Sequence, residues 1–347
     1  MKKLLLAFLS ITLVLTSASC QKKPERYKAS FLELFNTVTE VIAFADTEEE
    51  FMEFAEFIQS TLKEYHQLYD KYKLYEGVNN IKTINDNAGI TPVKVDQKII
   101  DMLLFSKEMY KKTDGKVNIA LGSVLEIWHE YREAGIYDPL NSKLPPMADL
   151  DAANAYTDIN MIIIDEDNST VYLADEHMRL DVGAIAKGYA TEMVAKKAVD
   201  EGYNNFLLSV GGNTRAIGYK GVNKELWNVG IQNPDKSSVI PTIYTLSIAD
   251  RSLVASGNYE RYYTVDGKMY HHIIDPNTLM PADYFTAISI LTQDSGIADA
   301  LSTAIYNMPY EEGLNLIEQF EGTEALWILP NGERKFSEHF MDYILEE

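Results

Sequence analysis

The sequence predicts an α+β fold in which mixed sheets pack against helices, with a smaller helical portion beside them. Segments with the apolar spacing of amphipathic helices, such as 47–71 and 96–112, follow segments of strand character without a fixed order. A regular succession of strand, helix and parallel strand would predict an α/β fold, and that rhythm is missing. The 347 residues are enough for one large domain or two closely packed ones.

The first half of the chain predicts one strand, two helices and a hairpin. Residues 29–45 alternate loosely between apolar and polar, as a half-buried strand does. Residues 47–71 and 96–112 each place apolar side chains on one helix face. Residues 161–165 and 170–174 predict a hairpin across the turn Asp167-Asn168-Ser169.

The second half begins with a predicted helix at 183–201 and a strand at 206–210 that enters the turn Gly211-Gly212. The remaining predicted strands are 227–232, 242–248, 260–265, 286–292 and 325–329, with helices at 298–307 and 311–320 before the last of them. The proline-rich segment 144–146 indicates a surface loop, interpreted as the seam between a helical portion and a sheet portion.

The charge of the chain narrows its possible ligands. Its 52 acidic and 31 basic side chains give a formal net charge of −21. Such a chain repels nucleic-acid phosphates, so no nucleic-acid partner is expected, and it is unsuited to binding a membrane through basic residues. A phosphate-containing ligand would need a local device, either a metal ion or backbone N–H groups.

The N-terminus has the pattern of an export signal. Lys2 and Lys3 precede an apolar run at 4–15, which is shorter than the ~20 residues that span a bilayer. Cys20 is the only cysteine, so no internal disulfide can form. We expect residues 1–19 to be a signal peptide and Cys20 to carry the lipid of a bacterial lipoprotein. A lipobox usually has leucine where Ser17 stands, and the alternative is ordinary cleavage that leaves a free thiol.

The expected layout follows from that signal. Residues 20–28 would form a lipid-anchor tether and residues 29–347 the folded domain. The protein is then expected at the bacterial cell membrane, lipid-anchored on its extracytoplasmic face.

Three short segments have polar or glycine-rich patterns that fit a phosphate ligand. In 180–189, Asp181 and a turn of small residues precede Lys187 at the start of a helix, as in sites that bind an anion at a helix N-terminus. The alternative is a helix capped by Asp181. Segment 208–213 ends a strand in two glycines, and 256–259 could present hydroxyl and N–H groups. A simple turn and strand packing explain these two segments equally well.

Two further segments could supply catalytic or metal-binding groups. His271 and His272 suggest zinc, but neighbours on a strand point to opposite faces and no zinc motif accompanies them. One of them could instead serve as a general base beside a phosphate. Asp299, Ser302 and Thr303 share one face of a predicted helix, a sparse oxygen set that suits magnesium and equally an ordinary helix start.

Taken together and in order, the five segments resemble the FAD:protein FMN transferase family, the ApbE-type flavin transferases. The family's LD-x-GxIAKGYA, VGG, SGxY, HIIDP and ADALST motifs correspond to residues 180–190, 210–212, 256–259, 272–276 and 298–303. The resemblance extends from about Phe35 to Phe340. It implies an ApbE-like, T-fold-like architecture for a flavin transferase domain at 29–347.

The resemblance also implies a set of site residues. The magnesium site would consist of the Ala184 backbone carbonyl with Asp299, Ser302 and Thr303. The catalytic residues would be His272, which activates the acceptor hydroxyl, and Asp299. The implied FAD contacts are Phe35, Tyr75, Lys116, Val117, Asn118, Asp181, Lys187 and Ile274. Trp128 is expected to be mainly structural.

Several positions depart from the family pattern around the expected flavin site. The family's MGT is Phe35-Asn36-Thr37, an aspartate is replaced by Asn118, and a threonine by Ala255. Residues 278–281 lack the usual glycine, whereas the metal motif is intact. Flavin contacts and acceptor choice are therefore expected to differ in detail.

The implied reaction moves FMN from FAD onto a Thr or Ser hydroxyl of a partner flavoprotein and releases AMP. Family acceptors are exported or membrane-bound flavoproteins of sodium-pumping and ferredoxin-linked respiratory complexes. Two alternatives remain open: an FAD pyrophosphatase in which water attacks, and a flavin-binding lipoprotein without chemistry. A zinc hydrolase built on His271 and His272 is disfavoured by the missing zinc motifs.

Overall fold

A computed structural model describes residues 23–32 and 34–345. Cys20 and the predicted signal peptide lie outside these residues. The centre of the fold is an antiparallel sheet with strand order β1-β2-β6-β7-β10-β13-β14-β15. Its strands are β1 (Glu25–Phe31), β2 (Thr39–Ala45), β6 (Phe206–Val210), β7 (Asn213–Ile217), β10 (Ser252–Gly257), β13 (Ala287–Thr292), β14 (Glu324–Ile328) and β15 (Arg334–Phe336).

Three smaller sheets accompany the large one. They are β3 (Val93–Lys94) with β5 (Thr170–Leu173) and β4 (Ile162–Asp165), β8 (Trp227–Gln232) with β9 (Thr242–Ile248), and β11 (Tyr262–Val265) with β12 (Lys268–His271). The helices are α1 (Glu48–Tyr69), α2 (Ile81–Asp86), α3 (Gln97–Lys112), α4 (Gly122–Tyr137), α5 (Met147–Asn154), α6 (Ala186–Asp200), α7 (Ser295–Tyr306) and α8 (Tyr310–Ile317). Short 3₁₀ turns are η1 (Leu34–Asn36), η2 (Pro139–Asn141), η3 (Ile159–Met161) and η4 (Phe340–Tyr343).

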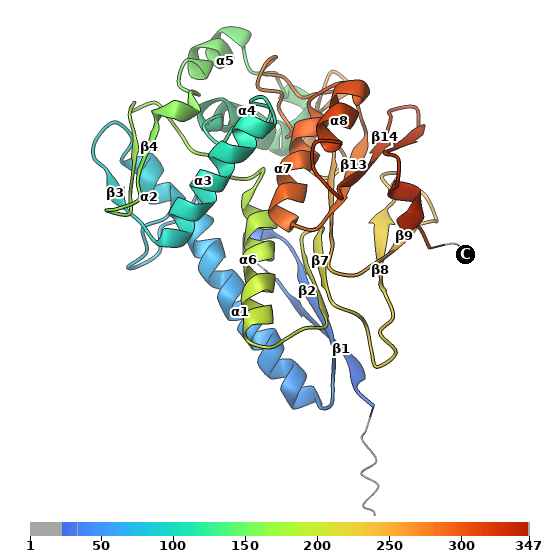
Figure 1. Ribbon diagram of the computed structural model, residues 1–347. Helices are drawn as coiled ribbons and strands as arrows, with labels where there is room; N and C mark the ends of the chain where they lie inside the picture. Colours follow the sequence, from blue (N-terminus) through green and yellow to red (C-terminus); the bar gives the residue numbers. More distant parts are fainter. Residues whose placement is uncertain (1–22, 33, 346–347) are drawn as a thin grey trace, which may run out of the picture.

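The two faces of the large sheet are covered differently. Helices α1, α6 and α7 lie on one face, and the β8–β9 hairpin lies on the other (Figure 1). Side chains alternate between the faces: Ile288 and Ile290 of β13 belong to the helix-side core, whereas Leu291 belongs to the core under β8 and β9. Because both faces are covered, every residue of β13 is buried.

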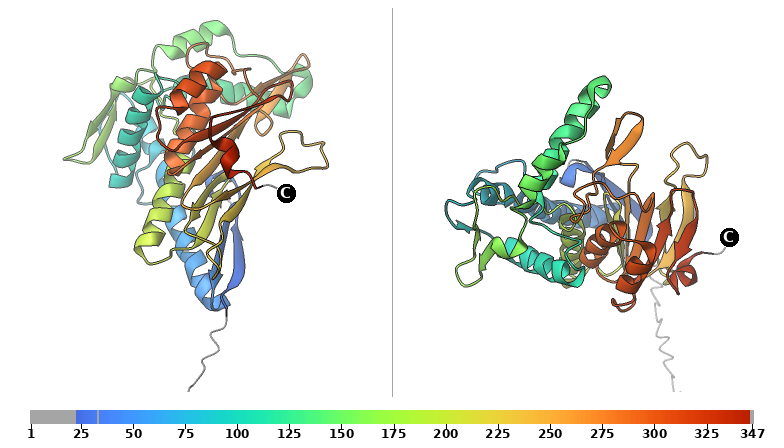
Figure 2. Two further views of the ribbon diagram at one scale, coloured as in Figure 1. Left: turned by 45° about the vertical axis from the view of Figure 1, so that its right-hand side comes forward. Right: turned by 90° about the horizontal axis from the view of Figure 1, so that it is seen from above.

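The helical portion lies to one side of this sheet. Helices α4 and α5 pack together there, and α4 extends away from the rest of the molecule in the right-hand view of Figure 2. A third core cluster joins α4 to the β11–β12 hairpin through Trp128, whose indole N–H donates to the Leu279 carbonyl at 2.8 Å. Trp128 thus has the structural role that was expected.

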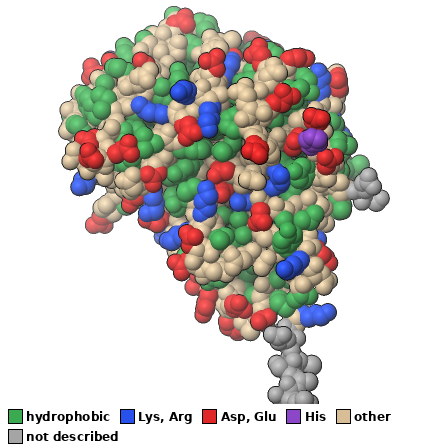
Figure 3. Space-filling view, in the orientation of Figure 1, with side chains coloured by type: hydrophobic (Ala, Val, Ile, Leu, Met, Phe, Trp, Pro, Cys, Tyr) green, Lys and Arg blue, Asp and Glu red, His purple; other side chains and the backbone are tan. Residues whose placement is uncertain are grey.

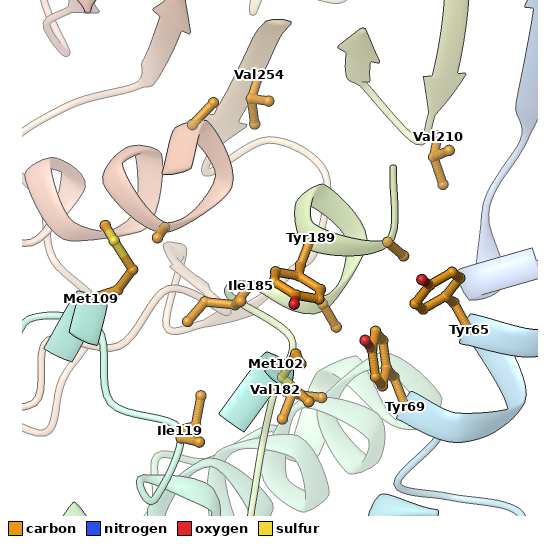
Figure 4. Close-up of a cluster of buried hydrophobic side chains, with 14 of the residues drawn as sticks. Tyr65, Tyr69, Met102, Met109, Ile119, Val182, Ile185, Tyr189, Val210 and Val254 are labelled. Carbon is orange, nitrogen blue, oxygen red and sulfur yellow. The ribbon is translucent and has the colours of Figure 1, made fainter. Parts of the chain in front are cut away.

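The helix-side core continues beneath the segment 180–189. Tyr189 of α6 packs 6.4 Å from Tyr69 of α1 between ring centroids, and Tyr65 lies beside Tyr69 (Figure 4). Ile185 is fully buried in the same cluster. Apolar packing of Ile185 and Tyr189 therefore fixes the start of α6, and this fixes the position of the polar side chains that the first turn of α6 carries.

The α+β class is confirmed, and several local predictions are corrected. Residues 29–45 form two antiparallel strands joined through η1, because Phe35 and Asn36 both adopt φ of 53° and reverse the chain. The predicted helix at 183–201 begins only at Ala186, after a turn. Segment 144–146 lies between two helical elements and directly precedes α5, so it is not a seam between helices and sheets.

Sequence reasoning missed the elements whose apolar pattern is short or irregular: α2, α4, α5, β3, β7, β10, β12 and β15. In the part of the chain that the structure describes, no helix combines the length and hydropathy required to cross a bilayer. Acidic and basic side chains are interspersed over the face seen in Figure 3, so negative charge does not gather in one patch there.

Candidate active site

Asp299 is placed by the close crossing of α6 and α7. Its Oδ2 accepts a hydrogen bond from the backbone N–H of Gly188 at 2.8 Å, and its side chain is 7% exposed. A Cβ at Gly188 would lie 2.3 Å from the Ser295 carbonyl oxygen and 2.4 Å from Asp299 Cβ. Only glycine allows this approach, and the approach brings the carboxylate to the first turn of α6.

Lys187 brings a positive charge to the same point. Its Nζ lies 3.7 Å from Asp299 Oδ1 and donates to Asn213 Oδ1 at 2.9 Å. Asn213 follows the Gly211-Gly212 turn, in which both glycines have positive φ. Three segments far apart in sequence therefore meet through their side chains.

Asn213 is a site residue that sequence reasoning did not single out. It is fully buried, and its Nδ2 has no hydrogen-bond partner among the described residues. A buried amide N–H without a partner is unusual and points to a ligand or water as its acceptor. Its position directly after a double-glycine turn was the available signal.

Ser302 and Thr303 continue along α7. The Ser302 hydroxyl donates to the backbone carbonyl of Asp299 at 2.9 Å and lies 2.8 Å from the Ser256 hydroxyl on β10. The half-buried Thr303 side chain makes no hydrogen bond to any residue that the structure describes. The 256–259 and 298–303 segments thus meet through their serine hydroxyls.

These groups fit a magnesium ion. Asp299 Oδ1 accepts no hydrogen bond from any residue that the structure describes, since Lys187 Nζ is 3.7 Å away. The hydroxyls of Ser302 and Thr303 follow on the same helix. One carboxylate with neutral oxygens is a donor set that magnesium completes with water and phosphate oxygens. Across residues 23–32 and 34–345, no three His, Cys, Asp or Glu side chains gather around one metal position.

Asp181 and Lys71 form a second ion pair of the site. Lys71 Nζ lies 2.5 Å from Asp181 Oδ2, and the N–H of Gly183 donates to Asp181 Oδ1 at 2.9 Å. Burial raises the pKa of Asp181, but the charge of Lys71 and these hydrogen bonds outweigh it and hold the pKa below its usual value. Asp181 therefore orders the turn before α6, and it does not cap the helix, whose N-cap is Ile185.

Lys71 itself was missed by sequence reasoning. Burial alone would lower its pKa, but Asp181 raises it above the ordinary lysine value, so the pair is fully charged. Nothing in its local sequence distinguishes Lys71 from other lysines after a helix. Only the fold brings it to Asp181.

Lys116 pairs with the segment 271–276. Its Nζ lies 3.0 Å from Asp275 Oδ1, and both side chains are largely buried. Asn307 at the end of α7 donates to the carbonyls of Ile274 and Thr303, at 3.4 and 3.2 Å. Asn307 therefore joins the segment that contains Ile274 and Asp275 to α7 at Thr303.

Two other implied FAD contacts, Val117 and Asn118, have side chains that contact the protein itself. Val117 is 1% exposed in the helix-side core. The Asn118 side chain donates to the Thr157 carbonyl at 2.9 Å and accepts from the Ala120 N–H at 2.8 Å. In this structure both residues shape the loop that carries Lys116.

The two histidines have different roles. His271 donates from Nε2 to the Ala282 carbonyl at 2.6 Å and accepts the Ile273 N–H at Nδ1, so neither ring nitrogen is free for zinc. His272 has a buried Nδ1 without a hydrogen-bond partner among the described residues. Burial, followed by the charge of Arg261, lowers the pKa of His272 to about 3, so its ring is neutral near pH 7.

Phe35 and Tyr75 meet through a histidine that sequence reasoning also missed. The Phe35 N–H donates to His66 Nδ1 at 3.2 Å, and His66 Nε2 lies 3.3 Å from the Tyr75 hydroxyl. That hydroxyl donates to Asp70 Oδ2 at 2.7 Å. The two implied flavin contacts are thus neighbours although 40 residues separate them.

Known proteins resemble this chain over most of its length. The sequence model of the ApbE family matches residues 35–327. An FAD:protein FMN transferase of Treponema pallidum is 31% identical over 300 residues, which cover 83% of this chain and 82% of the relative. One from Klebsiella pneumoniae is 30% identical over 272 residues, covering 76% and 81%.

Solved structures show the same fold. The ApbE protein of Thermotoga maritima superimposes with a TM-score of 0.79 at 27% identity, over 93% of this chain and all of the other. The flavin transferase ApbE of Vibrio cholerae gives 0.76 at 20% identity, over 92% and 99%. With the family match covering most of the sequence and the motifs converging in space, the chain belongs to the ApbE family.

Proposed function

We infer that this protein transfers FMN from FAD to a hydroxyl group of a flavoprotein and releases AMP. The observation that carries this inference is the meeting of Asp299, Lys187 and Asn213 at the start of α6. A carboxylate, a lysine and an orphaned amide form a local site for a pyrophosphate in an otherwise acidic protein. Relatives that are 31% and 30% identical to this chain are named FAD:protein FMN transferases.

We further propose Mg²⁺ as the metal, held by Asp299, Ser302, Thr303 and the Ala184 carbonyl. When bound, it would neutralise negative charge on the phosphate oxygens of FAD. Lys187 and the N-terminal N–H groups of α6 would orient the same phosphates. Asn213 would add one N–H donor from its free Nδ2.

His272 is the proposed base. The acceptor oxygen forms a bond to the FMN phosphorus, the bond from that phosphorus to the bridging oxygen breaks, and AMP leaves with the electron pair. The neutral His272 ring accepts the hydroxyl proton. The low pKa of His272 is set first by burial and then by nearby charges that include Arg261 and Arg132. An anionic substrate beside these arginines would offset their charge and make the ring a stronger base.

The test is mass spectrometry of a flavoprotein acceptor domain incubated with the protein, FAD and Mg²⁺. We expect a mass gain equal to covalent FMN, with AMP released in equal amount, abolished by EDTA and by Asp299→Ala. Free FMN and AMP with an unmodified acceptor would replace the proposal with an FAD pyrophosphatase. Unchanged FAD would leave a flavin-binding protein.

We also propose that a lipid on Cys20 holds the protein on the extracytoplasmic face of the bacterial membrane. Exported or membrane-bound flavoproteins of respiratory complexes would then be within reach as acceptors. The proposal rests on the sequence pattern of residues 1–20. Cys20→Ser should move the protein from the membrane fraction to the soluble exported fraction, and an unchanged membrane association would contradict it.

A further inference from the structure

Two segments flank the site, and His66 lies between them. We call residues 34–38 the first arm and residues 70–75 the second arm. His66 belongs to the last turn of α1 and is half-buried. Both arms contact His66, and each arm also contacts a different part of the candidate active site.

The first arm touches the double-glycine turn. The Gly211 N–H donates to the Val38 carbonyl at 3.0 Å, and a Cβ at Gly211 would lie 2.5 Å from Thr37 Oγ1. Gly211 leads to Asn213, which accepts from Lys187. The position of the first arm is therefore coupled to the proposed phosphate-binding side chains.

The second arm touches the turn before α6. Lys71 pairs with Asp181, and Asp70 accepts both the Tyr72 N–H and the Tyr75 hydroxyl at 2.7 Å. The second arm is therefore coupled to the opposite side of the site.

The hydrogen bonds fix the protonation state of His66. A backbone N–H can only donate, so Nδ1 must accept from Phe35, and the ring proton must be on Nε2, directed at the Tyr75 oxygen. Tyr75 then donates its own proton to Asp70. Each donor in this series of hydrogen bonds has one acceptor. A second proton on the His66 ring would occupy Nδ1 and leave the Phe35 N–H without its acceptor.

Phe35 depends on that acceptor. Its φ of 53° is a left-handed conformation that a bulky residue adopts only where the surroundings hold it. Its ring also packs edge-on against His66, with centroids 5.5 Å apart. Loss of the hydrogen bond would free the first arm to relax.

We propose that His66 is a positioning residue that, in its neutral form, clamps the two arms so that Phe35 and Tyr75 both face the flavin substrate. The proposal rests on the proposed function, because it assigns the flavin of FAD to the space between the arms. The groups that face His66 are Asp70, Lys73, Tyr75 and Phe35. Burial lowers the pKa of His66, Asp70 opposes this and Lys73 adds to it, so the clamp is closed near pH 7 and opens in acid.

The experiment measures the Kd of the mature protein for FAD between pH 7.5 and pH 5.0. Opening of the clamp reduces the fraction of protein molecules whose arms are positioned to bind FAD. We therefore expect the Kd to rise several-fold in acid, up to roughly tenfold. His66→Asn keeps an acceptor near the Nδ1 position but does not titrate, so its Kd should stay flat over this range. His66→Phe should bind FAD roughly tenfold more weakly at both pH values.

The controls separate this inference from folding and from the proposed function. His339→Asn removes an exposed histidine that pairs with Asp342, away from both arms, and should keep the pH dependence of the native protein. Thermal unfolding identifies variants that fail to fold, and if His66→Phe does so, His66→Asn carries the test. A His66→Asn variant that titrates like the native protein would overturn the clamp. FAD binding that follows the expected pattern without FMN transfer would instead overturn the proposed function alone.

Discussion

Individual residues of the site differ mainly in how the protein sets their charge. Asp181 and Lys71 stabilise each other's charged forms, whereas His272 is kept neutral by burial and by neighbouring arginines. These opposite effects arise within one protein of strongly negative formal charge. Local partners, and not the net charge, decide the protonation of each group.

Replacement of Lys71 by Met should weaken FAD binding and transfer. The change leaves a buried Asp181 carboxylate without its partner, which costs about 3 kcal/mol or more in comparable pairs, so the turn before α6 should shift. Lys63→Met, at an exposed position on α1 outside both arms, is the matched control and should retain activity. Equal activity of both variants, measured as transfer rate at saturating Mg²⁺, would contradict this role for the ion pair.

The low pKa of His272 predicts a pH dependence of stability. The unfolded chain binds a proton near pH 6.5 and the folded chain only near pH 3, so the free energy of unfolding should fall as pH decreases between these values. The slope from this one group is at most about 1.4 kcal/mol per pH unit. Urea unfolding of His272→Gln should lack this contribution, and identical slopes in both proteins would show that His272 titrates normally.

At the scale of elements, the crossing of α6 and α7 decides the site. Asp294 caps α7 by accepting the Gly296 and Ile297 N–H groups, which fixes where the helix begins. The crossing then sets which residue of α7 meets the first turn of α6. A shift of one residue along α7 would turn Asp299 away from Gly188 by about 100°.

Gly188→Ala tests this crossing. The added Cβ would clash with the Ser295 carbonyl and Asp299 Cβ, so we expect a loss of stability of roughly 1–3 kcal/mol and at least a tenfold loss of transfer. Gly313→Ala on α8 is the matched control, since its Cβ would come no closer than 3.3 Å to its neighbours. It should cost less stability and leave transfer intact. Chemical denaturation measures the loss of stability, and the mass-spectrometric assay measures the loss of transfer. A fully active Gly188→Ala protein would show that the close crossing of α6 and α7 is not required for transfer.

For the whole molecule, the large sheet joins two cores into one structure. Trp327 lies in the helix-side core, Trp227 in the core under β8 and β9, and Trp128 in the cluster around α4. Strands β13 and β14 contribute side chains to both of the first two cores. Because the same strands form both cores, we expect the two cores to lose their packing together.

The three tryptophans can report on this coupling. In a Trp128→Phe background, single-tryptophan proteins that retain only Trp227 or only Trp327 should unfold at the same urea midpoint, because their cores share strands. Fluorescence of each protein measures its own core. Midpoints that differ beyond the change in stability caused by each substitution would show that the two faces unfold separately.

The fold class and the long amphipathic elements could be predicted from the sequence because their signal is periodic and local. Helices α1 and α3 and the hairpin β4–β5 match their predicted ranges to within a residue or two. The break between β1 and β2 could not be predicted, since it depends on left-handed backbone at Phe35 and Asn36 that His66 supports from a distant helix. Short strands such as β7 were missed because their burial comes from neighbouring strands rather than from their own pattern.

The motifs by themselves determined the family, and they predicted which residue types would bind the proposed metal, because ordered short sequences and helical spacing are properties of the chain. Only the tertiary structure decided the partners: Lys71 for Asp181, Asn213 for Lys187, Asp275 for Lys116, and His66 between Phe35 and Tyr75. Each of these pairs joins side chains that are distant in sequence. Charge, burial and hydrogen bonding act over a few ångströms in space, so the local sequence that places a residue on its element does not specify which residue will face it.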